Sequence, residues 1–96
     1  MRLDEHEKRA LKYALQEFDG NVYIFGSRIN DKKKGGDIDL LLIPQGETNQ
    51  LKLSLTVQAR FFSKCEQKLD VVVYEETNLF CREIIKSAQR IDIRRI

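Results

Sequence analysis

The apolar runs of the chain predict a small set of strands. Residues 22–25 form a short, continuous apolar run rich in strand-forming side chains, which predicts a strand buried on both faces. Residues 38–43 and 69–74 predict two more strands, the last of them centred on three valines. The tail, residues 90–94, alternates between charged and apolar side chains and predicts a short edge strand.

Apolar residues at helical spacing predict helices at residues 4–18 and 78–87. The first of these begins with Asp4 and Glu7, which have the spacing of a capping box. Gly20 follows its last apolar residue and reads as a stop signal. Along the sequence, one of these helices precedes the three predicted strands and the other follows them.

Residues 50–64 support two interpretations. Strict alternation of apolar and polar residues favours a half-buried strand, whereas the length of the run and the Thr48-Asn49 pair before it favour a capped helix. We predict a helix there. The resulting order of elements is typical of an α/β (α+β) domain, with a small mixed β-sheet of three to four strands flanked by helices.

Length and composition restrict the function classes. The 96 residues predict one domain, residues 1–96, and the net charge of +2 argues against nucleic-acid binding by bulk electrostatics. No apolar run approaches the roughly 20 residues of a membrane span, and the charged start is not a secretory signal. The two cysteines, Cys65 and Cys81, fit neither a disulfide framework nor a zinc pattern, so we expect reduced thiols in a cytoplasmic protein.

Three aspartates are the first candidates for chemistry. Asp37 and Asp39 lie two residues apart at a strand, so their side chains point to the same face about 6–7 Å apart at the backbone. Asp70 opens the next strand and completes a three-carboxylate cluster if the two strands are neighbours. Crowded carboxylates favour Mg²⁺ or Mn²⁺ over softer metals. The alternative is that Asp37 is a turn residue and Asp70 merely begins a strand.

A small-residue turn and a basic loop precede the aspartates. Gly26 permits close approach of the backbone to a phosphate, Ser27 adds a hydroxyl, and Arg28 is the best basic candidate for a triphosphate contact. A Gly-Ser pair alone is usually a plain turn, and the lysines at 32–34 are usually a solvated loop. The turn supports a phosphate site only in combination with the carboxylates that follow it.

In combination, Gly26-Ser27-Arg28, Asp37-Ile38-Asp39-Leu40 and Leu69-Asp70-Val71 resemble the polymerase-β-like nucleotidyltransferase superfamily. They look most like its minimal nucleotidyltransferases (MNT) of bacteria and archaea. The resemblance spans residues 22–74 and implies a nucleotidyltransferase fold with a helix at residues 50–64. Many minimal members carry a small residue and a second basic residue where this chain has Ile29-Asn30-Asp31.

The resemblance implies a role for each candidate residue. Asp37 and Asp39 would bind metal ions that bridge the nucleotide triphosphate. Asp70 would bind the catalytic metal and help to deprotonate the attacking hydroxyl. Gly26 and Ser27 would hold the β- and γ-phosphates.

The same resemblance implies an Mg²⁺-dependent transferase that moves a nucleoside monophosphate, AMP from ATP or another NTP, to an acceptor hydroxyl. Larger relatives carry a second domain for the acceptor, so we expect another subunit to supply that site here, in a homo- or hetero-oligomer. Minimal members are often encoded with a small helical HEPN-type protein, and some are antitoxins that adenylylate a tyrosine of that toxin. The alternative is a non-catalytic nucleotide- or partner-binding subunit that retains the fold.

Overall fold

Four strands form one mixed sheet in the spatial order β3-β2-β1-β4. The strands are β1 (Gly20–Phe25), β2 (Ile38–Pro44), β3 (Leu69–Val73) and β4 (Gln89–Ile91). β1 runs antiparallel to β2 and β4, and β2 and β3 are parallel. The computed structural model describes residues 2–30 and 36–96, so the basic loop at 32–34 lies outside the described residues.

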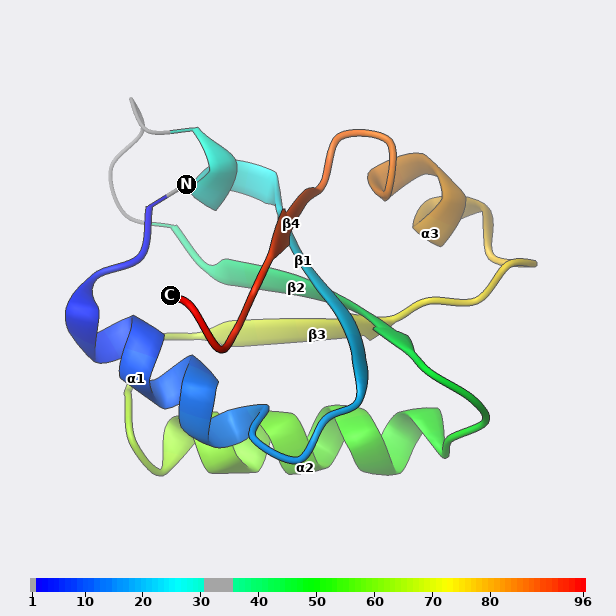
Figure 1. Ribbon diagram of the computed structural model, residues 1–96. Helices are drawn as coiled ribbons and strands as arrows, with labels where there is room; N and C mark the ends of the chain where they lie inside the picture. Colours follow the sequence, from blue (N-terminus) through cyan, green and yellow to red (C-terminus); the bar gives the residue numbers. More distant parts are fainter. Residues whose placement is uncertain (1, 31–35) are drawn as a thin grey trace.

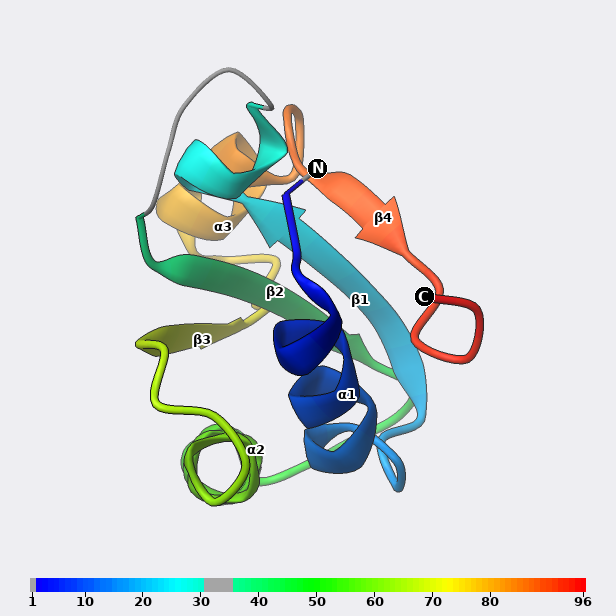
Figure 2. The ribbon, with the colours of Figure 1, turned by 90° about the vertical axis from the view of Figure 1, so that its left-hand side faces the viewer.

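Helices lie on both faces of this sheet. α1 (Glu5–Ala14) and α2 (Gln50–Phe62) pack side by side on one face. The short helix α3 (Leu79–Ile84) and the 3₁₀ turn η1 (Gly26–Ile29) lie on the other side (Figures 1 and 2). The predicted α+β class with a mixed sheet and flanking helices is therefore confirmed.

The main hydrophobic core lies between the sheet and the two long helices. Leu11 of α1, Phe61 of α2 and Ile24, Leu40 and Leu42 of the sheet are fully buried there. On the opposite face, α3 contributes the buried Cys81, whose Sγ lies 3.8 Å from the Val73 carbonyl. None of the helices within the described residues has the length and hydrophobicity that a transmembrane segment needs.

The ambiguous segment is helical, as predicted. Leu53, Val57 and Phe61 recur every four residues and face the core. Leu51 and Leu55 are 69% and 55% exposed on the outer side of the same helix. The alternation along the sequence therefore arises from apolar residues on two faces of one helix, and the Asn49 cap, which accepts from the Lys52 amide, marks its start.

Two local predictions were wrong. The first helix ends at Ala14, four residues before the predicted end, and the chain leaves it through a tighter turn. Gly20 does not stop the helix but begins β1, with φ of +147°. A side chain there would collide with the carbonyl oxygen of Ile43, so close pairing of the two strands requires this glycine.

The first strand also differs from its prediction. Val22 and Ile24 are buried, but Tyr23 and Phe25 are partly exposed, so only one face of β1 is fully covered. The reason is that α3 is too short to cover the whole second face of the sheet. The edge strand at the tail is confirmed, with bounds Gln89–Ile91 rather than 90–94, and pairs with β1.

Candidate active site

The strand register places two of the predicted carboxylates side by side. Asp39 of β2 is the direct partner of Asp70 in the parallel strand β3. On its other side Asp39 pairs with Phe25, at the end of β1. Side chains of paired residues share a sheet face, so these three lie in a row across the face that carries α3. Figure 2 looks toward this end of the sheet, where β1 ends and β2 begins.

The core determines which way the carboxylates point. Ile38 and Leu40, on either side of Asp39, are fully buried among the residues of the main core. Because side chains alternate along a strand, Asp39 must point to the opposite face. A register shift of one residue would bury the carboxylate and expose both apolar side chains, so the packing energy of the core holds Asp39 in place.

The Asp39 carboxyl lies in an environment that disfavours its charge. Burial raises its pKa most, and the negative charges of Asp70 and Asp37 and a hydrogen bond with Asp70 raise it further. Lys68 acts in the opposite direction but is the smallest of these influences. Asp39 and Asp70 thus form a coupled pair that gains stability from a shared proton or from a cation.

The third predicted carboxylate stands apart from this pair. Asp37 forms an ion pair with Lys68 at 3.5 Å, and both side chains are about half exposed or more. In the described part of the chain, no three acidic, histidine or cysteine side chains are close enough together to hold a metal ion. The structure therefore brings together Asp39 and Asp70, while Asp37 lies at the same end of the sheet with its charge partly neutralised.

The donor chemistry of the pair fits a divalent cation. Asp39 and Asp70 offer carboxylate oxygens, the ligands that Mg²⁺ and Mn²⁺ prefer. Burial and the neighbouring charges of Asp70 and Asp37 raise the pKa of Asp39, and a cation at this position would favour its ionised form. Asp37 can join them by leaving an exposed ion pair, which costs little.

The small-residue turn lies directly against the carboxylates. Gly26 has φ of +75°, and a Cβ at that position would lie 2.5 Å from Oδ2 of Asp39. Gly36 has φ of +91°, and a side chain there would collide with the Ser27 hydroxyl. Both glycines are therefore required for close approach, and they bring Ser27, Gly36 and Asp39 into one corner of the molecule.

Arg28, the predicted triphosphate contact, is buried and bonded within the protein. Its two terminal nitrogens donate to the two carboxylate oxygens of Glu7, each at 2.8 Å. Its Nε donates to the Gly36 carbonyl at 3.0 Å, and one terminal nitrogen also donates to the Arg2 carbonyl at 2.8 Å. The Glu7 carboxylate raises the pKa of Arg28, and each side chain is only 6% exposed. The guanidinium thus joins α1 to both ends of the loop that carries the site.

Sequence reasoning did not assign Glu7, Phe25 or Lys68 to the site. Glu7 was predicted only as half of the capping box, which the structure confirms, with Asp4 and Glu7 bonding each other's backbone. Its second partner lies 21 residues away, a separation at which spacing carries no signal. Phe25 lies beside the site because it is the strand partner of Asp39. This pairing can be inferred only when the order of the strands is known.

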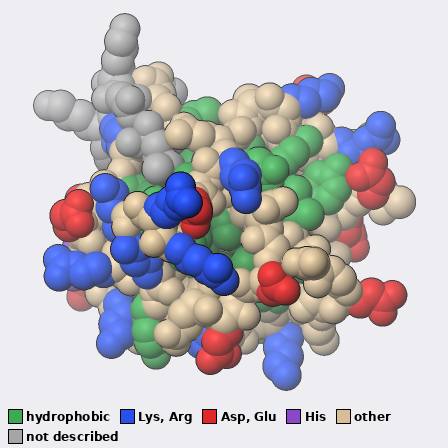
Figure 3. Space-filling view, viewed as in Figure 1, with side chains coloured by type: hydrophobic (Ala, Val, Ile, Leu, Met, Phe, Trp, Pro, Cys, Tyr) green, Lys and Arg blue, Asp and Glu red, His purple; other side chains and the backbone are tan. Residues whose placement is uncertain are grey.

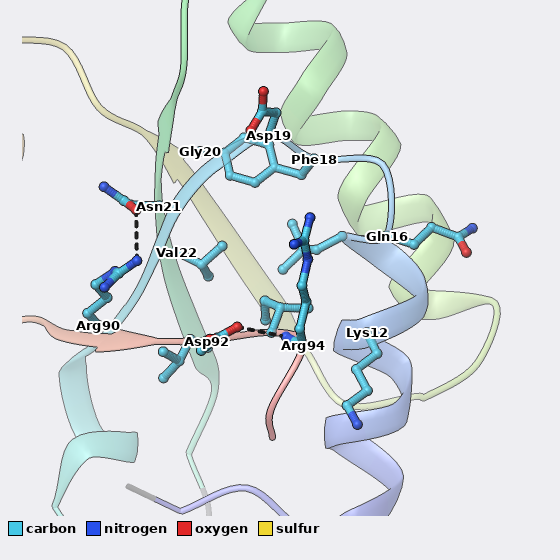
Figure 4. Close-up of a pocket in the computed structure, with 13 residues that line it drawn as sticks. Lys12, Gln16, Phe18, Asp19, Gly20, Asn21, Val22, Arg90, Asp92 and Arg94 are labelled. Atoms are coloured by element: carbon cyan, nitrogen blue, oxygen red, sulfur yellow. Dashed lines mark hydrogen bonds between the residues drawn. The ribbon is translucent and has the colours of Figure 1, made fainter.

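A cavity lies away from the carboxylates, at the beginning of β1. It has a volume of about 630 Å³ and lies between the end of α1, the start of β1 and the segment after β4 (Figure 4). Arg90 donates to Asn21 at 3.2 Å on one side of it. Neither Asp39 nor Asp70 lines this cavity, which is at the opposite end of β1 from Phe25. It has no geometric link to the carboxylate chemistry.

Comparison with models of known protein families identifies a match. A family model described as "Polymerase beta, Nucleotidyltransferase" matches residues 15–94. The match includes the small-residue turn and all three aspartates, and it begins after α1, so Glu7 lies outside it. Among proteins with curated functions, none matches this chain.

Proposed function

The chain belongs to the polymerase beta nucleotidyltransferase family, and on this basis we propose that it transfers a nucleoside monophosphate from an NTP to an acceptor hydroxyl. The single observation that supports activity is the adjacency of Asp39 and Asp70 in the strand register, with the pKa of Asp39 raised. Carboxylates crowded in this way are typical of sites that handle protons and cations. The donor we propose is ATP, which supplies AMP.

In the proposed reaction the acceptor oxygen bonds to the α-phosphorus, and the bond between that phosphorus and the bridging oxygen breaks. Pyrophosphate leaves with the electron pair of that bond. The hydroxyl proton passes to the Asp39–Asp70 pair, where Asp70 is the proposed base. Mg²⁺ held by Asp39 and Asp70, with Asp37, would supply positive charge against the charge that develops on the phosphates.

The corner beside Asp39 suits the β- and γ-phosphates. Gly26 carries no side chain that would block a ligand, and the Ser27 hydroxyl lies next to it. Arg28 supports this corner by bonding the Gly36 carbonyl, and we assign it the positioning of the loop. This role replaces the direct triphosphate contact as our hypothesis for Arg28, because four of its five N–H donors are already bonded within the protein.

We propose a partner protein as the source of the acceptor. On the resemblance to minimal nucleotidyltransferases, the partner is a small helical HEPN-type toxin, the acceptor a tyrosine of that toxin, and this chain its antitoxin in the cytoplasm. The exposed apolar residues Leu51, Leu55 and Phe62 on α2 support a role in homo- or hetero-oligomers, since they leave an apolar helix face uncovered by the described residues.

One observation favours a second candidate, a non-catalytic subunit that binds a nucleotide or a partner. The described residues hold no assembled three-residue metal group, and Asp37 is paired with Lys68. Such a subunit would bind its ligand without transferring any part of it.

The test is label transfer from ATP. The protein is incubated with Mg²⁺, the product of the neighbouring gene, and ATP labelled at the α- or the γ-phosphate. We expect transfer of the α-label only, and a loss of at least about a hundredfold in Asp39→Asn. Asp92→Asn, on the exposed segment after β4, is the matched control and should transfer normally.

The outcomes separate the two candidates. No transfer, together with metal-dependent ATP binding, would leave the non-catalytic subunit as the function. Transfer that persists in Asp39→Asn would show that the pair does not carry the chemistry. Transfer of the γ-label would mean that the protein is a kinase and not a nucleotidyltransferase.

A further inference from the structure

One aromatic ring lies beside the carboxylate pair, and a second ring contacts the first. Phe25 is the strand partner of Asp39, so its ring stands on the same sheet face as the carboxylates. Phe80, in the first turn of α3, meets Phe25 edge to face, with 6.2 Å between ring centroids and 76° between ring planes. The row across the sheet therefore continues from Asp70 and Asp39 through Phe25 to Phe80.

Phe80 is held in place although much of it is exposed. Its backbone amide donates to the Asn78 side chain at 2.9 Å, and its neighbour Cys81 is fully buried. The Phe80 side chain itself is 55% exposed, which is unusual for an anchored aromatic residue. Figure 3 shows hydrophobic side chains at the surface on the upper right, the side on which α3 lies in Figure 1.

The edge-to-face contact leaves room for another ring. Such a contact uses only one face of one of the two rings, so the exposed aromatic surface can stack on a further ring. A nucleoside triphosphate has a charged end and an aromatic end. If the carboxylates and the Gly26–Ser27 corner take the charged end, the aromatic end needs a partner nearby.

We propose that Phe80, supported by Phe25, is the stacking platform for the nucleobase of the nucleoside triphosphate. This inference rests on the proposed function, because it takes the triphosphate to lie at the carboxylates. Stacking on a phenylalanine accepts every base, since each has an aromatic face. The platform therefore provides affinity for nucleotides over inorganic phosphates, without selecting strongly among ATP, GTP, CTP and UTP.

The first experiment uses tryptophan as both the platform and the reporter. The chain has no tryptophan, so Phe80→Trp introduces a single fluorophore. We expect ATP with Mg²⁺ to quench its fluorescence, and tripolyphosphate with Mg²⁺ to leave it unchanged. Phe62→Trp is the matched control, because Phe62 is 46% exposed but lies on α2, on the other side of the sheet. Its fluorescence should respond to neither ligand.

The second experiment measures affinity. In Phe80→Ala the Kd for ATP should rise about tenfold, which is the typical loss of one stacked base, while the Kd for tripolyphosphate stays unchanged. Phe80→Leu should fall between the two, because it keeps apolar area without an aromatic face. Thermal unfolding of each variant checks that the fold is retained, as expected for a half-exposed side chain.

Two failures are distinguishable. If the wild-type protein binds ATP in a metal-dependent way and Phe80→Ala binds it equally well, the platform is wrong and the proposed function stands. If the wild-type protein binds neither ATP nor tripolyphosphate in the presence of Mg²⁺, the proposed function and the platform both fall. Quenching of Phe80→Trp by tripolyphosphate as strongly as by ATP would also overturn the platform.

Discussion

Two pairs of charged side chains lie beside the loop that joins β1 to β2, and they differ in every electrostatic respect. Glu7 and Arg28 have opposite charges, are almost completely buried, and bond each other through both carboxylate oxygens. Asp39 and Asp70 have like charges and are partly exposed. Burial and the charge of Asp70 raise the pKa of Asp39. The first pair is electrostatically satisfied by the protein alone, whereas the second is not.

This difference separates structure from chemistry within a small domain. The Glu7–Arg28 pair holds the ends of the loop against α1 and needs no ligand. The ionised form of Asp39 is disfavoured by burial and by the charge of Asp70, and a proton on Asp39 or a bound cation relieves this. Perturbed carboxyl groups of this kind are typical of functional sites, whereas a satisfied buried pair is typical of a structural anchor.

The largest expected effect comes from breaking the satisfied pair. Glu7→Gln removes the charge but keeps a side chain that can serve the capping box, so it leaves the buried Arg28 guanidinium without a counter-charge. Breaking a buried pair in this way typically costs about 3 kcal/mol or more, a large part of the stability of a domain of this size. The free energy of unfolding in urea measures the loss.

Two variants control that measurement. Glu5→Gln removes the charge of a glutamate that is 79% exposed in the same helix, and should change stability by less than about 0.5 kcal/mol. Glu7→Met combined with Arg28→Met replaces both charges by apolar groups and should recover part of the loss. If Glu7→Gln is no worse than Glu5→Gln, the pair is not a structural anchor.

Added metal should stabilise the protein through the Asp39–Asp70 pair. A divalent cation that binds the folded Asp39–Asp70 pair stabilises the protein by about 2.7 kcal/mol at a hundred times its Kd. That corresponds to a rise in Tm of at least about 10 °C for a domain of this size. We expect the rise with Mg²⁺ or Mn²⁺ in the wild type and none in Asp39→Asn. An equal rise in both would place the metal elsewhere.

The parts of the site that follow from strand geometry could be predicted from the sequence. Asp39 lies between two core residues of a strand, so its direction follows from the period of two. Asp70 opens a run that was predicted to be a strand, and the structure places that strand beside β2. Gly26 is next to a strand end, where a close approach is common. The neighbourhood of these residues therefore follows from the local pattern of apolar and polar positions.

The parts that depend on side chains from distant segments could not be predicted. Arg28 was predicted to be a phosphate ligand because it follows Gly26-Ser27. In the structure it forms an ion pair with Glu7, which lies on α1. Asp37 was grouped with Asp39 by spacing, yet the strand begins at Ile38, and Asp37 turns toward Lys68. Both cases are long-range charge pairings, and local sequence patterns contain no information about them.

Glycine substitutions should show how closely the loop approaches Asp39. Gly26→Ala and Gly46→Ala both place a side chain at positive φ, at +75° and +97°, which costs about 1–2 kcal/mol each. The Cβ at position 26 also meets the Asp39 carboxylate, while position 46 has nothing within 4 Å. We expect similar losses of stability but a loss of Mg²⁺-induced stabilisation only in Gly26→Ala. If Gly46→Ala loses it equally, the effect is a general one.

The smallest expected effect is the pH dependence of the metal-free protein. The pKa of Asp39 is higher in the folded than in the unfolded state, so its stabilising contribution is fully present below the unfolded pKa and is lost as pH rises through the folded pKa. Subtracting the unfolding free energy of Asp39→Asn from that of the wild type isolates this contribution. The difference should become more favourable to the wild type as pH falls from about 7 to about 4.

Saturating Mg²⁺ should reverse the sign of that trend, since the cation binds the ionised pair and competes with protons. The wild type would then gain over Asp39→Asn as pH rises. A difference that stays constant with pH in the absence of metal would show that Asp39 ionises as easily in the folded protein as in the unfolded chain. In that case the pair would be as well satisfied as Glu7 and Arg28, and the electrostatic reason for a cation at this site would disappear.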